Sequence, residues 1–118
     1  MPMRDAIAAA LAREYAAAKA ATEQGATDIA WHHLERAHIL SQTAFVPHIV
    51  SHWRMLRLAL AERDGREAAG QLVRLALAPL GNLTGRLPIG NTGRSTVSAF
   101  APMDIPPDLA AILDRNRG

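Results

Sequence analysis

The sequence predicts an all-α protein of four antiparallel helices, arranged as an array or bundle, followed by a loop-rich arm and a short final helix. Apolar residues recur at helical spacing through residues 4–78, and Gly and Pro interrupt this pattern where helices should end. Residues 82–105 lack the helical period. A chain of 118 residues can bury one core, so we predict a single domain over residues 1–118.

The first two predicted helices span residues 4–24 and 28–42. The first is rich in alanine, the strongest helix former, and carries Ile7 and Leu11 on one apolar stripe. Gly25 is typical of the residue that follows a helix, so it predicts the break between the two.

The third and fourth predicted helices span residues 47–63 and 66–78. Pro47 suits the first turn of a helix, and Asp64-Gly65 breaks the pattern between the two. We expect the fourth helix to end at Pro79. The apolar residues predicted to be buried are Ile49, Trp53, Leu56 and Leu60 on the third helix, and Leu72, Val73 and Leu75 on the fourth.

Residues 82–105 are rich in Gly, Pro, Asn, Ser and Thr, which predicts an extended arm lying against the bundle. Pro106-Pro107 can then start a short helix over residues 107–115. Leu109, Ile112 and Leu113 share one face of that helix and should dock it on the others.

Composition excludes several classes of function. Cysteine is absent, so the chain forms no disulfide, thiolate metal site or cysteine nucleophile. The net charge is only +2 and basic residues are spread along the chain, which argues against nucleic-acid binding. No apolar stretch approaches the roughly 20 residues that span a bilayer, and none resembles a signal peptide. We therefore expect a cytoplasmic protein.

The histidines are the most informative residues, because all five lie between residues 32 and 52. His48 and His52 are spaced i, i+4, and Glu35 and His38 are spaced i, i+3, so each pair shares one helix face. A transition metal needs several such ligands within a few ångströms. The cluster therefore predicts a metal site between the second and third helices.

A hairpin of these two helices, turning near Ala44, places residues whose numbers sum to about 90 at the same height. His38 then lies level with His52, and His48 lies one turn nearer the connection. We expect these three histidines to be the nitrogen ligands. Glu35 could be a fourth ligand or could hold a ring nitrogen in the right tautomer, and His33 is the reserve ligand.

Nitrogen and carboxylate ligands without sulfur favour zinc, copper(II), nickel or iron. The leading hypothesis is a metal buffer, sensor or carrier. No serine lies in a nucleophile motif and no substrate pocket is evident, so an enzyme is the less favoured interpretation. The alternative is a helical protein–protein interaction module or homodimer whose histidines are structural, since histidines at the border of a core often pack against their neighbours.

A second candidate site is the loop over residues 88–96. Its glycine-rich backbone could turn N–H groups toward an anion, with Arg94 and either Thr92 or Ser95 completing the cradle. The loop lacks the Gly-Lys-Ser/Thr ending of a P-loop, so a structural turn is the favoured interpretation.

The segment Ala30-Trp-His-His-Leu34-Glu-Arg-Ala37 resembles the second helix of a tetratricopeptide-type hairpin, with small and large residues alternating. No 34-residue self-similarity follows, so the resemblance covers one hairpin. It implies helical-repeat packing and a peptide-binding groove.

A wider resemblance covers most of the chain. It rests on Trp31-His-His-Leu-Glu-Arg-Ala-His-Ile-Leu-Ser-Gln42, Pro47-His48, His52-Trp53, Gly70-Gln71, Gly90-Asn-Thr-Gly93 and Pro102-Met103-Asp-Ile-Pro106. These motifs are similar to a bacterial family of small histidine-containing helical proteins that carry a domain of unknown function. The resemblance implies metal handling, through an association with heavy-metal-resistance loci, but assigns no reaction.

Overall fold

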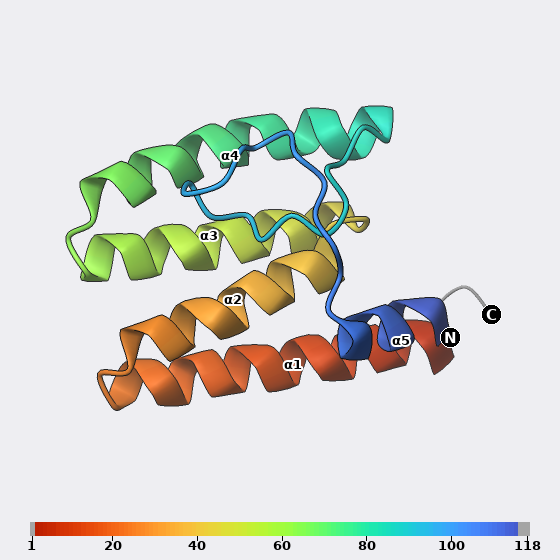
Figure 1. Cartoon of the computed structure of the whole chain (residues 1–118), viewed down its shortest axis with the longest axis horizontal. Helices are drawn as coiled ribbons and strands as arrows, with labels where there is room; N and C mark the ends of the chain where they lie inside the picture. The colour runs from red at the N-terminus through yellow and green to blue at the C-terminus, as the bar shows by residue number, and fades with distance from the viewer. Residues whose placement is uncertain (1, 116–118) are drawn as a thin grey trace.

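A computed structural model of the protein describes residues 2–115, and the side chains of residues 5–115. Within that range the chain is all-helical, with five helices and no strand (Figure 1). The helices are α1 (Pro2–Glu23), α2 (Thr27–Ser41), α3 (Phe45–Ala61), α4 (Gly65–Thr84) and α5 (Pro107–Arg115). The prediction of an all-α chain is thus confirmed for the described residues.

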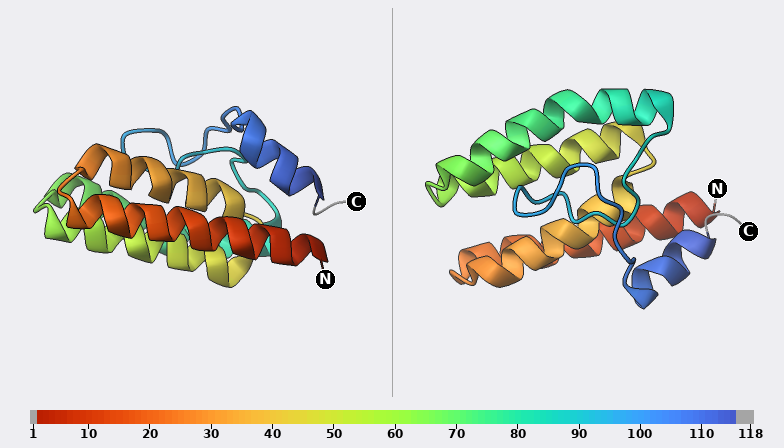
Figure 2. Two further views of the ribbon diagram at one scale, coloured as in Figure 1. Left: turned by 90° about the horizontal axis from the view of Figure 1, so that it is seen from below. Right: turned by 45° about the horizontal axis from the view of Figure 1, so that its top comes forward.

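The four long helices lie side by side in chain order, with α1 against α2, α2 against α3, and α3 against α4 (Figure 1). Between α4 and α5, residues 85–106 form the arm, which crosses from α4 over α2 before α5 packs on α1 and α2 (Figure 2). The tetratricopeptide-like character of this arrangement stays a prediction.

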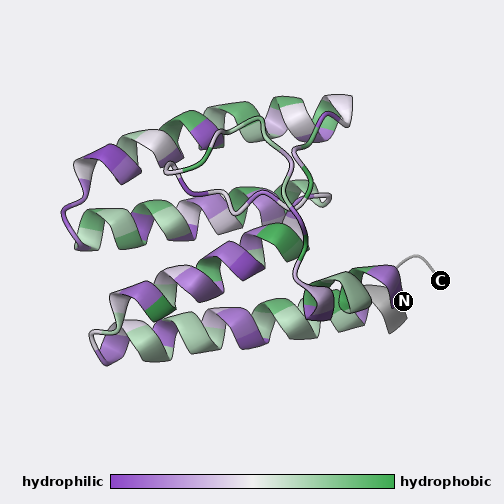
Figure 3. Ribbon diagram, in the orientation of Figure 1, coloured by the Kyte–Doolittle hydropathy of each residue, from purple (hydrophilic) through white to green (hydrophobic). Residues whose placement is uncertain are grey.

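Two apolar clusters hold the helices together. The larger cluster draws residues from all four long helices, among them Trp31 and Met55. It also contains alanines, whose small side chains allow the helices to approach closely. The smaller cluster joins α1, α2 and α5, where Leu109 is fully buried against Ile39 and Leu40. Figure 3 shows hydrophobic and hydrophilic residues alternating along each long helix. None of the described helices is long and apolar enough to cross a membrane.

The predicted end of the fourth helix at residue 78 is wrong, because α4 continues through Pro79 to Thr84. A proline inside a helix removes one backbone hydrogen bond, yet the turns around it persist. The helix ends instead at Gly85, whose φ of 73° is the left-handed conformation that a glycine readily adopts. This extension carries Asn82 alongside α3.

The predicted apolar stripes of α3 and α4 are also wrong in part. Trp53 and Leu60 are 53% and 61% exposed, and Leu72 and Val73 are more than half exposed as well. The stripe that α3 buries contains His48, Ser51, His52, Met55, Leu56 and Ala59. The stripe that α4 buries contains Glu67, Ala68, Gln71 and Ala78. Polar side chains therefore occupy core positions where the two helices face α2 and the arm.

Candidate metal centre

Three histidines meet at the buried junction of α2 and α3. His38 comes from α2, and His48 and His52 lie one turn apart on α3, so their rings face the same direction. Their exposed fractions are 2%, 4% and 3%. One ring nitrogen of each lies within 4.8 Å of the other two, and His38 Nε2 lies 3.1 Å from His52 Nε2. The structure thus brings together the three histidines that helix phasing selected.

Each of the three rings is held through its other nitrogen, Nδ1. His38 Nδ1 lies 2.7 Å from the backbone carbonyl of Asn91 in the arm. A carbonyl oxygen only accepts, so Nδ1 of His38 carries the proton.

The other two acceptors are side-chain amides whose orientation is fixed by their own bonds. The Nδ2 group of Asn82 donates to the carbonyl of Gln42 at 3.0 Å, so its Oδ1 faces His48 Nδ1 at 2.7 Å. The Nε2 group of Gln71 donates to Glu67 and to the carbonyl of Gly93, so its Oε1 faces His52 Nδ1 at 2.8 Å. Both rings must therefore donate from Nδ1.

These bonds leave Nε2 of all three rings without a proton in the neutral form. Three lone pairs then converge in one buried place, which is the donor arrangement of a three-histidine metal site. An oxygen acceptor on the opposite nitrogen also makes an imidazole a better ligand and fixes its angle.

The site keeps its imidazoles neutral. Burial lowers the pKa of His38 well below its usual value, and the neighbouring His52 and His48 lower it further. Burial also lowers the pKa of His52 to about 4, although its bond to Gln71 opposes the shift, and it lowers the pKa of His48. A metal ion therefore meets little competition from protons near neutral pH.

Behind Gln71 lies a buried carboxylate, Glu67, which is 2% exposed. Burial raises its pKa, but the Ser95 N–H, Gln71 and Arg94 all donate to it, and the net shift is downward. The arm thus supplies a guanidinium and an N–H group that keep Glu67 ionised, and Glu67 orients the amide that holds His52.

Glu35 and His33, the two further predicted ligands, lie outside the three-histidine group. The carboxylate of Glu35 pairs with Arg94 at 3.2 Å, and His33 Nδ1 lies 2.8 Å from the Glu14 carboxylate on α1. Glu35 shares a face of α2 with His38, but its carboxylate is engaged by Arg94, and the ring of His33 is engaged by Glu14.

Arg94 and Thr92, the predicted anion candidates, serve the packing of the arm. The guanidinium of Arg94 binds Glu67 at 3.0 Å and Glu35 at 3.2 Å, and lies 3.8 Å from the centre of a Trp31 ring. The Thr92 hydroxyl accepts from the N–H of Arg94 at 3.5 Å. Because two carboxylates of the protein already bind this guanidinium, its role is structural, in agreement with the interpretation of the loop as a structural turn.

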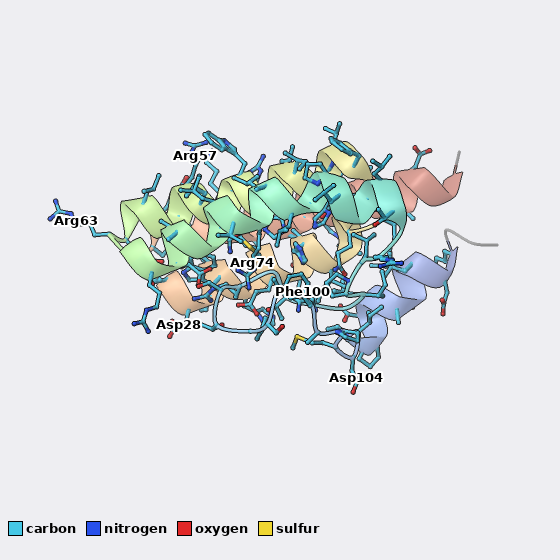
Figure 4. The ribbon with its side chains drawn as sticks, turned by 90° about the horizontal axis from the view of Figure 1, so that it is seen from above. Asp28, Arg57, Arg63, Arg74, Phe100 and Asp104 are labelled. Carbon is cyan, nitrogen blue, oxygen red and sulfur yellow. The ribbon has the colours of Figure 1, made fainter. Side chains whose placement is uncertain are left out.

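A cavity of about 390 Å³ opens beside the three histidines, between α4 and the arm. Arg74 of α4 and Phe100 of the arm line it and carry labels in Figure 4. Arg74 is close enough to His38 and His52 for its positive charge to lower the pKa of both rings. The three histidines therefore border a space that a ligand can enter.

Sequence reasoning missed the residues that orient the rings. Gln71 lies one turn after Glu67 on α4, and this polar pair on a helix face was the available signal. Asn82 lies beyond Pro79, where we expected no helix. Asn91 acts through its backbone carbonyl, which has no signature in the sequence.

Comparison with known proteins finds one family model. The model described as "Protein of unknown function (DUF3703)" matches residues 5–113. No curated protein and no solved structure matches the chain. The expected resemblance to a family with a domain of unknown function is confirmed, while its link to heavy-metal loci stays a prediction.

Proposed function

We propose that this chain, which belongs to the DUF3703 family of unknown function, holds one divalent transition-metal ion on the Nε2 atoms of His38, His48 and His52. The observation that carries the proposal is the commitment of all three Nδ1 atoms to oxygen acceptors. A structural histidine needs one hydrogen-bonded nitrogen, whereas here the three Nε2 atoms, which carry no proton in the neutral rings, also lie close together in the interior.

The three nitrogen donors limit which metals the site can hold. Three neutral imidazoles without sulfur suit zinc, copper(II), nickel or iron, and zinc is held by three histidines in many proteins. Zinc bound in this way keeps a fourth position for water or another ligand. We assign the protein to metal buffering, sensing or carrying; a place in heavy-metal resistance rests on the sequence resemblance alone.

The test is a zinc titration of the protein, purified without a polyhistidine tag, against a variant with His38→Gln, His48→Gln and His52→Gln. The matched control is His32→Gln with His33→Gln, which removes histidines of the same helix outside the group. We expect one equivalent bound by the protein and the control and none by the triple variant. Equal binding by all three proteins would sink the proposal.

A second candidate function is self-association or partner binding through α3 and α4. Their exposed large apolar side chains are Phe45, Val46, Trp53, Leu60, Leu72, Val73, Leu80 and Leu83. Apolar surface of this kind is typical of interaction sites. Sedimentation of the protein with and without Trp53→Glu and Val73→Glu tests it: a dimer that these changes dissociate supports it, and a monomer throughout argues against a homodimer.

A further inference from the structure

The cavity beside the histidines has the size of a small-molecule site, since such sites usually enclose about 300–1,000 Å³. His38, His48 and His52 lie at its wall, so a metal ion on their Nε2 atoms would have its remaining position directed at this space. The cavity therefore decides which ligand the ion can take there.

The charges around the cavity are all of one sign. Among the residues the structure describes, Arg74 and Arg86 line it and no aspartate or glutamate does. Neutral imidazoles bring no compensating charge, so a divalent ion would add two positive charges to these guanidinium groups. Arg86 is exposed and Arg74 is partly buried, so solvent screens part of this charge, but the excess of positive charge beside the histidines favours an anion as a further ligand of the ion.

Arg74 itself is held without a carboxylate. Its Nη1 and Nη2 atoms donate to the backbone carbonyls of Gly70 at 3.2 Å and Val97 at 2.7 Å, and its buried Nε has no partner. No ion pair to it exists among the described residues, in contrast to Arg94, which binds two carboxylates. Backbone carbonyls position this cation, and the carboxylate of Glu67, which is already paired with Arg94, acts on its charge without a direct ion pair.

The rest of the cavity wall is apolar. Leu77 and Leu80 of α4, Leu87 and Pro88 of the following turn, and Phe100 of the arm supply most of it. Phe100 is 76% exposed although it lines the cavity. Burying the hydrocarbon part of a ligand against this wall is favourable by about 25 cal/mol per Å² of apolar surface removed from water.

We propose that the cavity binds an organic carboxylate with an apolar body, whose carboxylate ligates the metal beside Arg74 while its hydrocarbon packs on Leu77, Leu80 and Phe100. The inference rests on the proposed metal site. An inorganic oxyanion such as phosphate would offset the positive charge but would not cover the apolar wall. A neutral hydrocarbon would cover the wall but would not offset the charge. Only a ligand with both parts matches the whole lining.

The experiment uses protein loaded with cobalt(II), whose visible absorption reports the ligands of the ion. Octanoate, acetate and phosphate are titrated separately. We expect octanoate to change the spectrum at a concentration at least tenfold lower than acetate or phosphate, because only octanoate fills the apolar part. Equal concentrations for octanoate and acetate, or tighter binding of phosphate, would overturn the inference.

Two variants test whether octanoate binds in the cavity. Arg74→Met should weaken octanoate at least tenfold without reducing the cobalt content, and the exposed control Arg57→Met should leave both unchanged. Phe100→Ala, at an exposed position that carries little risk to folding, should weaken octanoate and leave acetate unaffected. Octanoate affinity that neither Arg74→Met nor Phe100→Ala lowers would place the ligand elsewhere and contradict the inference.

The two proposals fail differently in this design. If the protein binds no cobalt(II), zinc or other divalent ion, the metal site is wrong and the carboxylate site falls with it. If cobalt(II) binds with the spectrum of a histidine site but octanoate leaves that spectrum unchanged, only the carboxylate site is wrong.

Discussion

His38 Nε2 and His52 Nε2 lie 3.1 Å apart in the interior, and each ring donates its Nδ1 proton to an oxygen on the opposite side. Two neutral imidazoles in this orientation direct lone pairs at each other, which is repulsive. A cation shared between the two nitrogens makes the arrangement favourable, and the third ring, His48, lies close enough to join them.

The tautomers can be observed directly. In the metal-free protein at pH 7, we expect His38, His48 and His52 to carry their protons on Nδ1. Long-range ¹H–¹⁵N correlation spectra distinguish the two ring nitrogens. A proton on Nε2 of two or more of these rings would contradict the hydrogen-bond network from which the site is inferred.

Replacement of Asn82 should weaken the metal site without removing a ligand. Asn82→Ala deletes the acceptor of His48 Nδ1–H, and loss of such a group typically lowers metal affinity about 10- to 100-fold. A zinc competition titration against a chelator measures the change. Thr84→Ala is the control, because Thr84 lines the same cavity and contacts none of the three rings through a hydrogen bond. An unchanged affinity in Asn82→Ala would argue that His48 is not a ligand.

Gly93→Ala should disturb the site from the arm. The φ of Gly93 is 84°, and a Cβ atom there would lie 2.8 Å from the Cγ and Cδ2 atoms of His38. We expect weaker zinc binding because the ring must move. Gly25→Ala is the matched control, since its φ is 73° and an added Cβ meets nothing within 4 Å. Both variants should lose stability from the backbone, but only Gly93→Ala should lose zinc affinity. Equal affinities would show that the arm does not set the His38 ring.

The metal-free protein should lose stability as the pH falls from about 6.5 to about 4. Burial lowers the pKa of His52 from 6.5 to about 4, so within this window the unfolded chain takes up a proton that the folded chain does not. The free energy of unfolding therefore rises with pH from about 4 to about 6.5. Above pH 6.5, His52 adds no further pH dependence. The contribution of His52 is on the order of 3 kcal/mol.

Urea denaturation at several pH values measures this dependence, with His52→Gln as the reference that lacks the group. The difference in pH slope between the two proteins isolates His52 from the carboxylates that also titrate below pH 5. An identical slope in both proteins would contradict a buried, neutral His52.

Arg94→Met should destabilise the fold by about 3 kcal/mol, because it leaves the buried carboxylate of Glu67 without its guanidinium partner. Adding Glu67→Gln should recover part of the loss, since the amide carries no charge. The free energy of unfolding in urea measures both. The exposed Arg57→Met should change it by less than about 0.5 kcal/mol. A loss no larger than that in Arg94→Met would mean that the arm is not anchored through this residue.

The helices and the grouping of the three histidines could be predicted because they follow from spacing. Helical periodicity places His48 and His52 on one face, and equal rise in a hairpin brings His38 level with them. Helical periodicity predicted the apolar stripes wrongly, because it assigned Trp53 and Leu72 to the core and both side chains are exposed. The helices bury histidine and glutamine instead, because the Nδ1 atoms of the histidines and the amide of Gln71 find hydrogen-bond partners there.

The supports of the site could not be predicted, for physical reasons that differ from residue to residue. Asn82 lies on the part of α4 beyond Pro79, and a proline is ordinarily a reason to end a predicted helix. Asn91 contributes a backbone carbonyl, which every residue possesses. Arg94 and Thr92 have the composition of an anion site, and only the fold shows that Glu67 and Glu35 already occupy that guanidinium.

The most direct test of the metal centre is anomalous diffraction from crystals of the zinc-loaded protein, collected on both sides of the zinc absorption edge. We predict one strong peak that lies about 2.0–2.1 Å from each of the Nε2 atoms of His38, His48 and His52. Zinc bound only at surface residues such as His32, with no peak among the three buried rings, would contradict it.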